Sequence, residues 1–323
     1  MSVVGRLRPA LLRGGAAASA AALGAAYYQR LPESHGDHRS AWSEGTGTRV
    51  YRTFLWPLVA QLDPEDAHLA ALRAGQAWQA ARACLEALKE LPLAWLVLPA
   101  PSQSVPSGPA LRQALFGGRL CFESPVGLAA GFDKNGLLVP LYRLGALPGL
   151  GFAEVGSVSA QPAAGNPRPR CWRVPSDEAV INFMGLNNDG AEAVAERLAA
   201  GAARGGAPVG VNIAKTHSPS ILGDEAVQDF VASFRRLARH ADFVVLNVSC
   251  PNTTEGKTFE EPSALRGLLE AIARERPGAA PPVLVKLVAP PDTPEGRGRL
   301  RELVGVLQAS GAVDGLVLSN TVP

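Results

Sequence analysis

The stretch NVSCPNT, residues 247–253, follows the apolar run DFVVL and places polar and reactive side chains where a buried strand is expected to end. Asn247 and Asn252 each carry an amide that both donates and accepts hydrogen bonds. Cys250 carries a thiol that can gain or lose a proton. Because Asn, Ser and Pro are also common in turns, the stretch alone leaves open whether it is a turn or a reactive site.

Other short apolar runs of the second half of the chain end in similar residues. The runs are 125–132, 152–158, 208–214, 243–249, 282–288 and 314–320, and they are rich in valine, as buried parallel strands are. Besides NVSCPNT, the residues at their ends are Asp133 to Asn135, Ser157, Asn212 with Lys215, Lys286, and Ser319 to Thr321. We expect these side chains to meet at one edge of a sheet.

Segments with helical spacing separate most of these runs, at 189–205, 224–241, 263–276 and 295–310. The long excursion 161–187 is expected to contain a small antiparallel hairpin. Repeated strand–helix units predict either an open α/β sheet or a (β/α)₈ barrel. No GxGxxG follows the first run, and barrel active sites collect at the carboxyl ends of strands, so the barrel is favoured.

The first third of the chain has a different composition. Residues 1–32 contain four arginines and no acid, which is typical of a mitochondrial transit segment, and the Ala- and Gly-rich run 14–28 is a marginal membrane anchor. A helical unit follows, in which Asp63 is the expected N-cap of a helix that Pro64 begins. The predicted organisation is a leader, possible anchor and linker at 1–49, a helical cap at 50–118 and the barrel at 119–323.

Composition excludes several classes of function. The formal net charge is only +2, which argues against a nucleic-acid partner. The four cysteines form no CxxC, the five histidines form no HExxH, and no metal site is expected. A serine nucleophile elbow and paired strand-end carboxylates are also missing from the sequence. The remaining Asn and Lys residues suit a planar, amide-rich small molecule, and lysine beside a flavin ring tunes its electronics.

Seven motifs carry a resemblance to a known family. They are PVGLAAGFDKNG, EVGSVSAQPAAGNPRPR, INFMGLNNDG, GVNIAK, NVSCPNT, LVKL and GLVLSNT, and their order and spacing are similar to those of the dihydroorotate dehydrogenases, from about residue 50 to the end. LDPEDAH in the helical unit resembles the membrane-associated, quinone-reducing class. The resemblance implies an FMN-binding (β/α)₈ barrel that oxidises dihydroorotate to orotate in pyrimidine biosynthesis. It also implies ubiquinone as electron acceptor and a mitochondrial inner-membrane location, with the N-terminal helices on the membrane surface.

The same resemblance assigns roles to individual residues. FMN would contact Ala129, Ala130, Gly131, Ser157, Asn212, Asn247, Lys286 and Ser319. The substrate would contact Lys134, Asn182, Phe183, Met184, Gly185, Leu186, Asn247, Asn252, Asn320 and Thr321. His68 and Arg173 would line a quinone tunnel under the helical cap, and Cys250 would be the base that removes the C5 proton while a hydride leaves C6 for the flavin. Lys215, which follows Asn212 closely, is expected only to place a positive charge near the site.

The sequence departs from the family pattern at three points. Cys250 stands where the quinone-reducing class usually has serine, and Leu186 stands where an aromatic residue is common. Only six of eight barrel strands are predicted, without the phosphate-binding loops after strands seven and eight, so an incomplete barrel is expected. Two alternatives stay open: an inactive membrane-associated remnant without cofactor, and another FMN barrel such as a dihydropyrimidine dehydrogenase domain or a tRNA dihydrouridine synthase.

Overall fold

The computed structural model describes residues 51–87, 111–145, 147, 150–201, 206–248, 259–276, 278, 280–288 and 290–320. The chain divides into two compact units. The first comprises residues up to Ala71 together with Arg168–Asn182, and the second comprises Leu72–Pro167 and Phe183–Pro323. The sheet that carries the strand-end residues lies in the second unit. The predicted domain boundaries at 49 and 118 stay a prediction.

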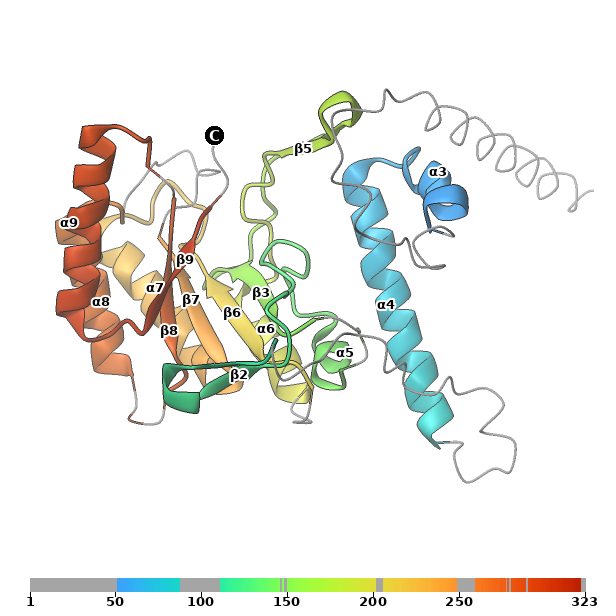
Figure 1. Cartoon of the computed structure of the whole chain (residues 1–323), viewed down its shortest axis with the longest axis horizontal. Helices are drawn as coiled ribbons and strands as arrows, with labels where there is room; N and C mark the ends of the chain where they lie inside the picture. The colour runs from blue at the N-terminus through green and yellow to red at the C-terminus, as the bar shows by residue number, and fades with distance from the viewer. Residues whose placement is uncertain are drawn as a thin grey trace, which may run out of the picture. The chain divides into compact units, whose positions relative to one another are not determined.

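The second unit is built around a five-stranded parallel sheet in the order β3-β6-β7-β8-β9 (Figure 1). The strands are β3 (Ala153–Val158), β6 (Val209–Ile213), β7 (Phe243–Asn247), β8 (Val283–Leu287) and β9 (Gly315–Leu318). The helices are α5 (Val139–Arg143), α6 (Gly190–Ala200), α7 (Gly223–Leu237), α8 (Pro262–Glu275) and α9 (Pro294–Ser310). These elements confirm the α/β class and five of the six predicted strands, and the sheet is open within the described residues.

The first predicted strand, 125–132, is wrong as a continuous strand. Leu128 forms an isolated parallel bridge with Ala153, and its N–H donates to the Phe152 carbonyl over 3.0 Å. Gly131 regains contact with β3 by donating its N–H to the Gly156 carbonyl over 2.8 Å. Its φ of +107° lies in a region that only glycine adopts easily, so the chain turns out of the extended conformation beside the sheet.

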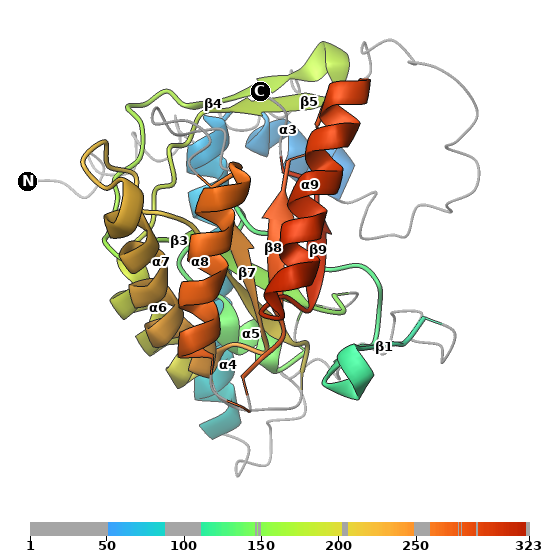
Figure 2. The ribbon, with the colours of Figure 1, turned by 90° about the vertical axis from the view of Figure 1, so that its left-hand side faces the viewer.

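The two faces of the sheet differ because alternate side chains of a strand point to opposite sides. One face packs against helices, of which α7, α8 and α9 stand in front of the strands in Figure 2. Its side chains include Val155, Val211, Leu246 and Val285, all completely buried. The residues beside them in sequence, Glu154, Asn212, Asn247 and Lys286, therefore point to the opposite face.

A short antiparallel hairpin that the sequence did not predict packs on the second face. It consists of β1 (Gln113–Leu115) and β2 (Leu120–Phe122), joined by η4 (Phe116–Gly118). Phe122 stacks on Phe152 with ring centroids 4.5 Å apart, and both belong to an apolar cluster with Phe243 at the start of β7. This cluster fills the amino end of the face and leaves polar residues at the carboxyl end.

Two aspartates fix the register at the amino ends of the strands. Asp242, just before β7, accepts the Val209 N–H over 2.7 Å, and its carboxylate also pairs with Arg143. Asp314, just before β9, accepts the Val283 N–H over 2.8 Å and pairs with Arg276. Each aspartate thus ties one strand to its neighbour in the sheet.

The first unit contains short helices and the predicted hairpin. Its helices are η2 (Tyr51–Leu55), α3 (Trp56–Val59) and the start of α4 (Pro64–Ala87), and its strands are β4 (Cys171–Val174) and β5 (Ala179–Asn182), joined by η5 (Pro175–Asp177). Asp63 is confirmed as an N-cap, because its carboxylate accepts the Glu65 N–H over 2.9 Å. Within the described part of the chain, no helix has the length and apolar character needed to cross a membrane. The leader and the run 14–28 lie outside the described residues.

Candidate active site

A chain of amide hydrogen bonds joins three strand ends. Asn247, the last residue of β7, donates from Nδ2 to Ser157 Oγ on β3 over 3.2 Å. Asn320, just after β9, donates from Nδ2 to Asn247 Oδ1 over 3.1 Å. Sequence reasoning placed all three residues in one site, and the structure brings them together. Ser319 lies beside them, and its hydroxyl donates to the Asn320 carbonyl over 3.1 Å.

Asn212 on β6 lies on the same face with its side chain completely buried. Its Nδ2 donates to Glu154 Oε1 on β3 over 2.7 Å, while its Oδ1 has no hydrogen-bond partner among the described residues. Burial raises the pKa of the Glu154 carboxyl, and the hydrogen bond from Asn212 and the charge of Lys286 oppose that rise. Lys286 on β8 is paired in register with Asn247. The site therefore combines the acidic side chain of Glu154, the basic side chain of Lys286 and the Asn212 Oδ1 acceptor.

Small residues border this edge. Ala129 and Gly131 are exposed, and a side chain built at Gly131 would meet nothing within 4 Å. Gly156 has φ +122°, and a Cβ there would lie 2.5 Å from the Asn212 carbonyl oxygen, so glycine alone allows β3 to approach β6 this closely. The open strip at 129–131 and the buried Asn212 acceptor together fit a planar ring with an N–H on its edge, as the flavin of FMN has.

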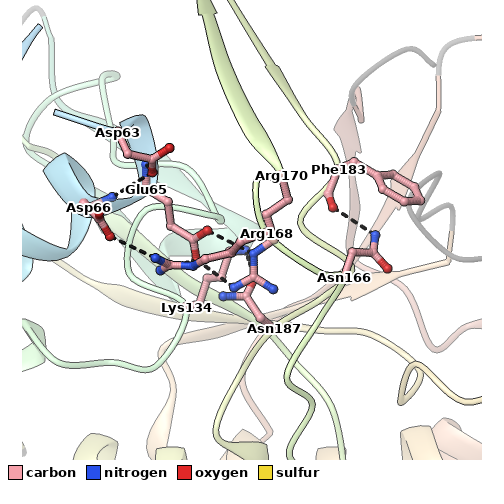
Figure 3. Close-up of polar contacts among 9 residues, drawn as sticks. All are labelled: Asp63, Glu65, Asp66, Lys134, Asn166, Arg168, Arg170, Phe183 and Asn187. Carbon is pink, nitrogen blue, oxygen red and sulfur yellow. Dashed lines mark hydrogen bonds and ion pairs between the residues drawn. The ribbon is translucent and has the colours of Figure 1, made fainter. Parts of the chain in front are cut away.

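Lys134 sits in a loop that Asp133 holds in place. The Asp133 carboxylate accepts the N–H groups of Leu137 and Leu138, each over 2.8 Å. The ammonium group of Lys134 donates to Asn187 Oδ1 over 2.5 Å, as Figure 3 shows. Asn187 was not among the predicted site residues, although it stands in the quoted motif INFMGLNNDG.

The predicted substrate stretch 182–186 is divided between the two units. Asn182 ends β5 in the first unit, whereas Phe183, Met184, Gly185 and Leu186 belong to the second. The Phe183 carbonyl accepts from Asn166 Nδ2 over 2.9 Å, as drawn in Figure 3. Leu186 has φ +55°, which is unusual for a branched residue. The contact of this stretch with substrate stays a prediction.

Lys215 makes contacts close to it in sequence. Lys215 donates to the carbonyls of Ser218 and Ile221, so its charge is engaged within its own loop. Cys250, Asn252 and Thr321 lie outside the described residues.

The two predicted tunnel residues lie in the first unit. The Arg173 guanidinium donates to the Leu62 carbonyl over 2.8 Å and lies 5.7 Å from the centroid of the Trp56 ring. His68 is half-buried on the first turns of α4. The contacts of Arg173 draw the β4–β5 hairpin to the helices of this unit, where a cation over an aromatic face is favourable.

An ion-pair cluster that sequence reasoning missed fixes the same hairpin to α4. Glu65 is 5% exposed and lies between Arg168 and Arg170, as Figure 3 shows. The hydrogen bond from Arg170 and its charge, with a smaller contribution from Arg168, hold the pKa of the Glu65 carboxyl below its usual range against the effect of burial. Two features of the sequence could have indicated this cluster: an acid in the first turn of a predicted helix, and the arginines of NPRPR.

Glu154 was also absent from the predicted site residues. The feature that could have indicated it is its position as a single acid inside the apolar strand FAEVGSV. A lone acid in a buried strand needs a partner on a neighbouring strand. The sequence does not say which neighbour supplies it, since β3 and β6 are far apart along the chain.

Comparison with known proteins places these residues in a family context. The family model of dihydroorotate dehydrogenase matches residues 111–322. A protein of Rhodopseudomonas palustris (strain TIE-1) named dihydroorotate dehydrogenase (quinone) is 40% identical over 279 residues, which cover 84% of this chain and 66% of that protein. One of Mycolicibacterium smegmatis with the same name is 49% identical over 183 residues, 56% of this chain and 48% of its own length. The chain thus spans about two thirds of the length of the R. palustris relative.

A solved structure is also similar. The crystal structure of DHODH in complex with ferulenol from Eimeria tenella aligns with a TM-score of 0.63 and 30% sequence identity, and covers 80% of this chain and 67% of that chain. This likeness supports a TIM-type barrel architecture, of which the described residues form an open part.

The predicted mitochondrial inner-membrane location is wrong. Rhodopseudomonas palustris, Deinococcus deserti and Mycolicibacterium smegmatis, from which similar curated relatives come, are bacteria and have no mitochondria. An Arg-rich, acid-poor start is a matter of composition alone, so it does not by itself identify a destination.

The family model covers most of the chain, and the strand-end residues it spans include Ser157, Asn212, Asn247, Lys286 and Asn320. Relatives at 40% identity or above carry one shared name. The chain therefore belongs to the dihydroorotate dehydrogenase family.

Proposed function

We propose that this protein catalyses the FMN-dependent oxidation of dihydroorotate to orotate, with ubiquinone as the electron acceptor, in de novo pyrimidine biosynthesis. The observation that carries the proposal is the amide network of Ser157, Asn247 and Asn320 beside the buried Asn212. Amides that both donate and accept match the alternating N–H and C=O groups of a pyrimidine ring. Membership of the family and the names of the relatives support the same reaction.

The residues present fit FMN. Asn212 offers a buried acceptor, and the small residues Ala129, Ala130 and Gly131 leave room for a flat ring beside β3. Lys286 carries a positive charge on the same face, which would stabilise negative charge on a reduced flavin. FMN, when bound, supplies the hydride acceptor, and the protein supplies position and electrostatics.

Cys250 is proposed as the base that removes the C5 proton of the substrate. A thiol has an ordinary pKa of about 8.5, so only a small fraction is thiolate near neutral pH unless the site helps. Asn247 at the end of β7, three residues earlier, would hold the substrate amide in place. Asn252, Thr321 and Lys134 are proposed as further substrate contacts.

The first unit is proposed to receive the quinone. Arg173 and His68 would line its path, with Arg173 held by the Leu62 carbonyl and the Trp56 ring. Phe54, Leu55 and Leu58 are exposed on the short helices of this unit, and such apolar side chains suit a membrane surface where quinones dissolve. Membrane association through these helices is part of the proposal.

The test is turnover by the purified full-length protein, with any natural segment downstream of Pro323 included, supplied with FMN. We expect a flavin absorbance spectrum after removal of free FMN, and dihydroorotate oxidation with a soluble ubiquinone analogue but not with fumarate or NAD. Flavin binding without activity on dihydroorotate would favour another FMN-barrel pyrimidine oxidoreductase. A colourless protein would favour a remnant without cofactor.

A further inference from the structure

Glu154 is the only acidic residue in the five parallel strands of the sheet. Its neighbour Val155 packs into the helix-facing core, so Glu154 points to the face that carries the strand-end amides. Its side chain is 7% exposed. A buried carboxylate of this kind needs a hydrogen-bond donor, and Asn212 supplies one from the adjacent strand.

That hydrogen bond determines which end of the Asn212 amide faces the site. An asparagine amide can present either its oxygen or its nitrogen, and the two ends differ in hydrogen-bond character. The Glu154 carboxylate accepts one N–H of Nδ2 over 2.7 Å, so the nitrogen end of the amide is turned to Glu154 and Oδ1 is left as an acceptor. Oδ1 is buried and has no partner among the described residues, which is unfavourable until a ligand donates to it.

The oxidised flavin ring has one N–H group, at N3, and the other polar atoms on its edge, N1, O2, O4 and N5, are acceptors. An acceptor fixed at the site is therefore complementary to this one edge position. We propose that Glu154 is a positioning residue for the flavin: by holding the Asn212 amide, it presents Oδ1 to the N3–H group. This inference rests on the proposed function, because it requires that the site binds FMN.

A glutamine at position 154 would remove this selection while keeping the size of the side chain. Its amide could accept from Asn212 Nδ2 or donate to Asn212 Oδ1, so both orientations of Asn212 would be allowed. The substitution also removes the negative charge beside Lys286. The N3–H group would then meet an acceptor for only part of the time.

The experiment measures the dissociation constants of FMN and of 3-methyl-FMN, which lacks the N3–H group, by quenching of flavin fluorescence. Glu154→Gln should weaken FMN about tenfold and the methyl analogue by less than about threefold, because only FMN can use the oriented acceptor. Any steric effect of the methyl group is present in both proteins and cancels from this comparison. Glu154→Ala is the second variant, in case the glutamine protein does not fold, and the same difference is expected.

Asp242→Asn is the matched control, since Asp242 is a carboxylate at the opposite, amino end of the strands and bonds to the Val209 N–H. It should change both dissociation constants by the same factor. Equal weakening of FMN and of its analogue by the Glu154 variants would overturn the inference and leave the proposed function standing. Failure of the unmodified chain to bind either flavin would overturn the proposed function, and the inference with it.

Discussion

The Arg170 guanidinium donates two hydrogen bonds to the Glu65 carboxylate, from Nη2 to Oε1 over 2.7 Å and from Nε to Oε2 over 3.0 Å. Both side chains are less than a tenth exposed. The pair ties the first turn of α4 to the segment that leads into the β4–β5 hairpin. Because these two residues lie in one unit, the hairpin with Arg173 is held to the helices of that unit.

Removal of Arg170 should destabilise this unit strongly. Arg170→Ala leaves the Glu65 carboxylate buried with one partner fewer, and we expect a loss of about 2 to 3 kcal/mol in the free energy of unfolding. Arg168→Ala is the matched control, because the Arg168 side chain is 47% exposed and its pairs with Glu65 and Asp66 are partly in water. Its loss should be clearly smaller than that of Arg170→Ala, because exposed ion pairs contribute little. Urea denaturation followed by tryptophan fluorescence measures the free energy of unfolding of both variants. Equal losses would show that the buried bidentate pair stabilises the protein no more than the exposed pairs do.

Glu65 also makes a prediction about pH. Its pKa is lower in the folded protein than in the unfolded chain, so its contribution to stability is complete above the unfolded carboxyl pKa of about 4.3. The contribution is lost as the pH falls from there through the lower folded value. Glu65→Gln should therefore show a flatter decline of stability below about pH 5 than the unmodified protein. The free energy of unfolding of each protein is measured as the pH is lowered. The same decline in both proteins would contradict the role assigned to this carboxylate.

The close approach of β3 to β6 depends on Gly156. Gly156→Ala places a Cβ 2.5 Å from the Asn212 carbonyl oxygen at a φ of +122°. Both the sheet and the proposed contact of Asn212 with flavin should be weakened. We expect a loss of more than about 2 kcal/mol in stability and weaker FMN binding. Gly267→Ala, in the middle of α8 with open space around its Cβ position, is the control and should be neutral or stabilising by up to about 1 kcal/mol. Similar thermal shifts for the two variants would contradict the close contact.

The aspartate before β9 should contribute to stability through its register bond. Asp314→Ala removes the acceptor of the Val283 N–H and the carboxylate partner of Arg276, whose guanidinium keeps, among the described residues, only the Ala312 carbonyl. We expect a loss of about 1 to 3 kcal/mol. The ion pair of Arg235 and Glu275 is more exposed, and Glu275→Ala should destabilise the protein clearly less than Asp314→Ala does. Thermal denaturation of the two variants side by side makes the comparison. A larger effect at Glu275 would argue against the structural role of Asp314.

Cys250→Ala should separate binding from chemistry. The variant should keep bound flavin and lose turnover by a factor of about 100 or more, which is the range that a general base contributes. A thiol-alkylating reagent should inactivate the unmodified protein, and orotate should protect it. Turnover near the unmodified level in the alanine variant would remove Cys250 from the mechanism.

The strands were predictable because β6, β7 and β8 are short valine-rich runs, and β6 and β7 are buried on both faces. The Asp63 cap was predictable because capping is a local interaction. The pair of Glu154 and Asn212 was not, since it joins residues 58 positions apart and depends on how β3 and β6 align. The pair of Glu65 and Arg170 spans 105 positions for the same reason. The prediction of a strand at 125–132 was wrong because apolar composition does not reveal the positive φ of Gly131.

The most direct measurement is the reduction of bound flavin under anaerobic conditions. FMN-loaded protein is mixed with dihydroorotate in the absence of oxygen, and flavin absorbance is followed in a stopped-flow instrument. The account predicts rapid bleaching by dihydroorotate and recovery of the colour when a ubiquinone analogue is added. A flavin that stays oxidised in excess dihydroorotate would contradict the proposed function.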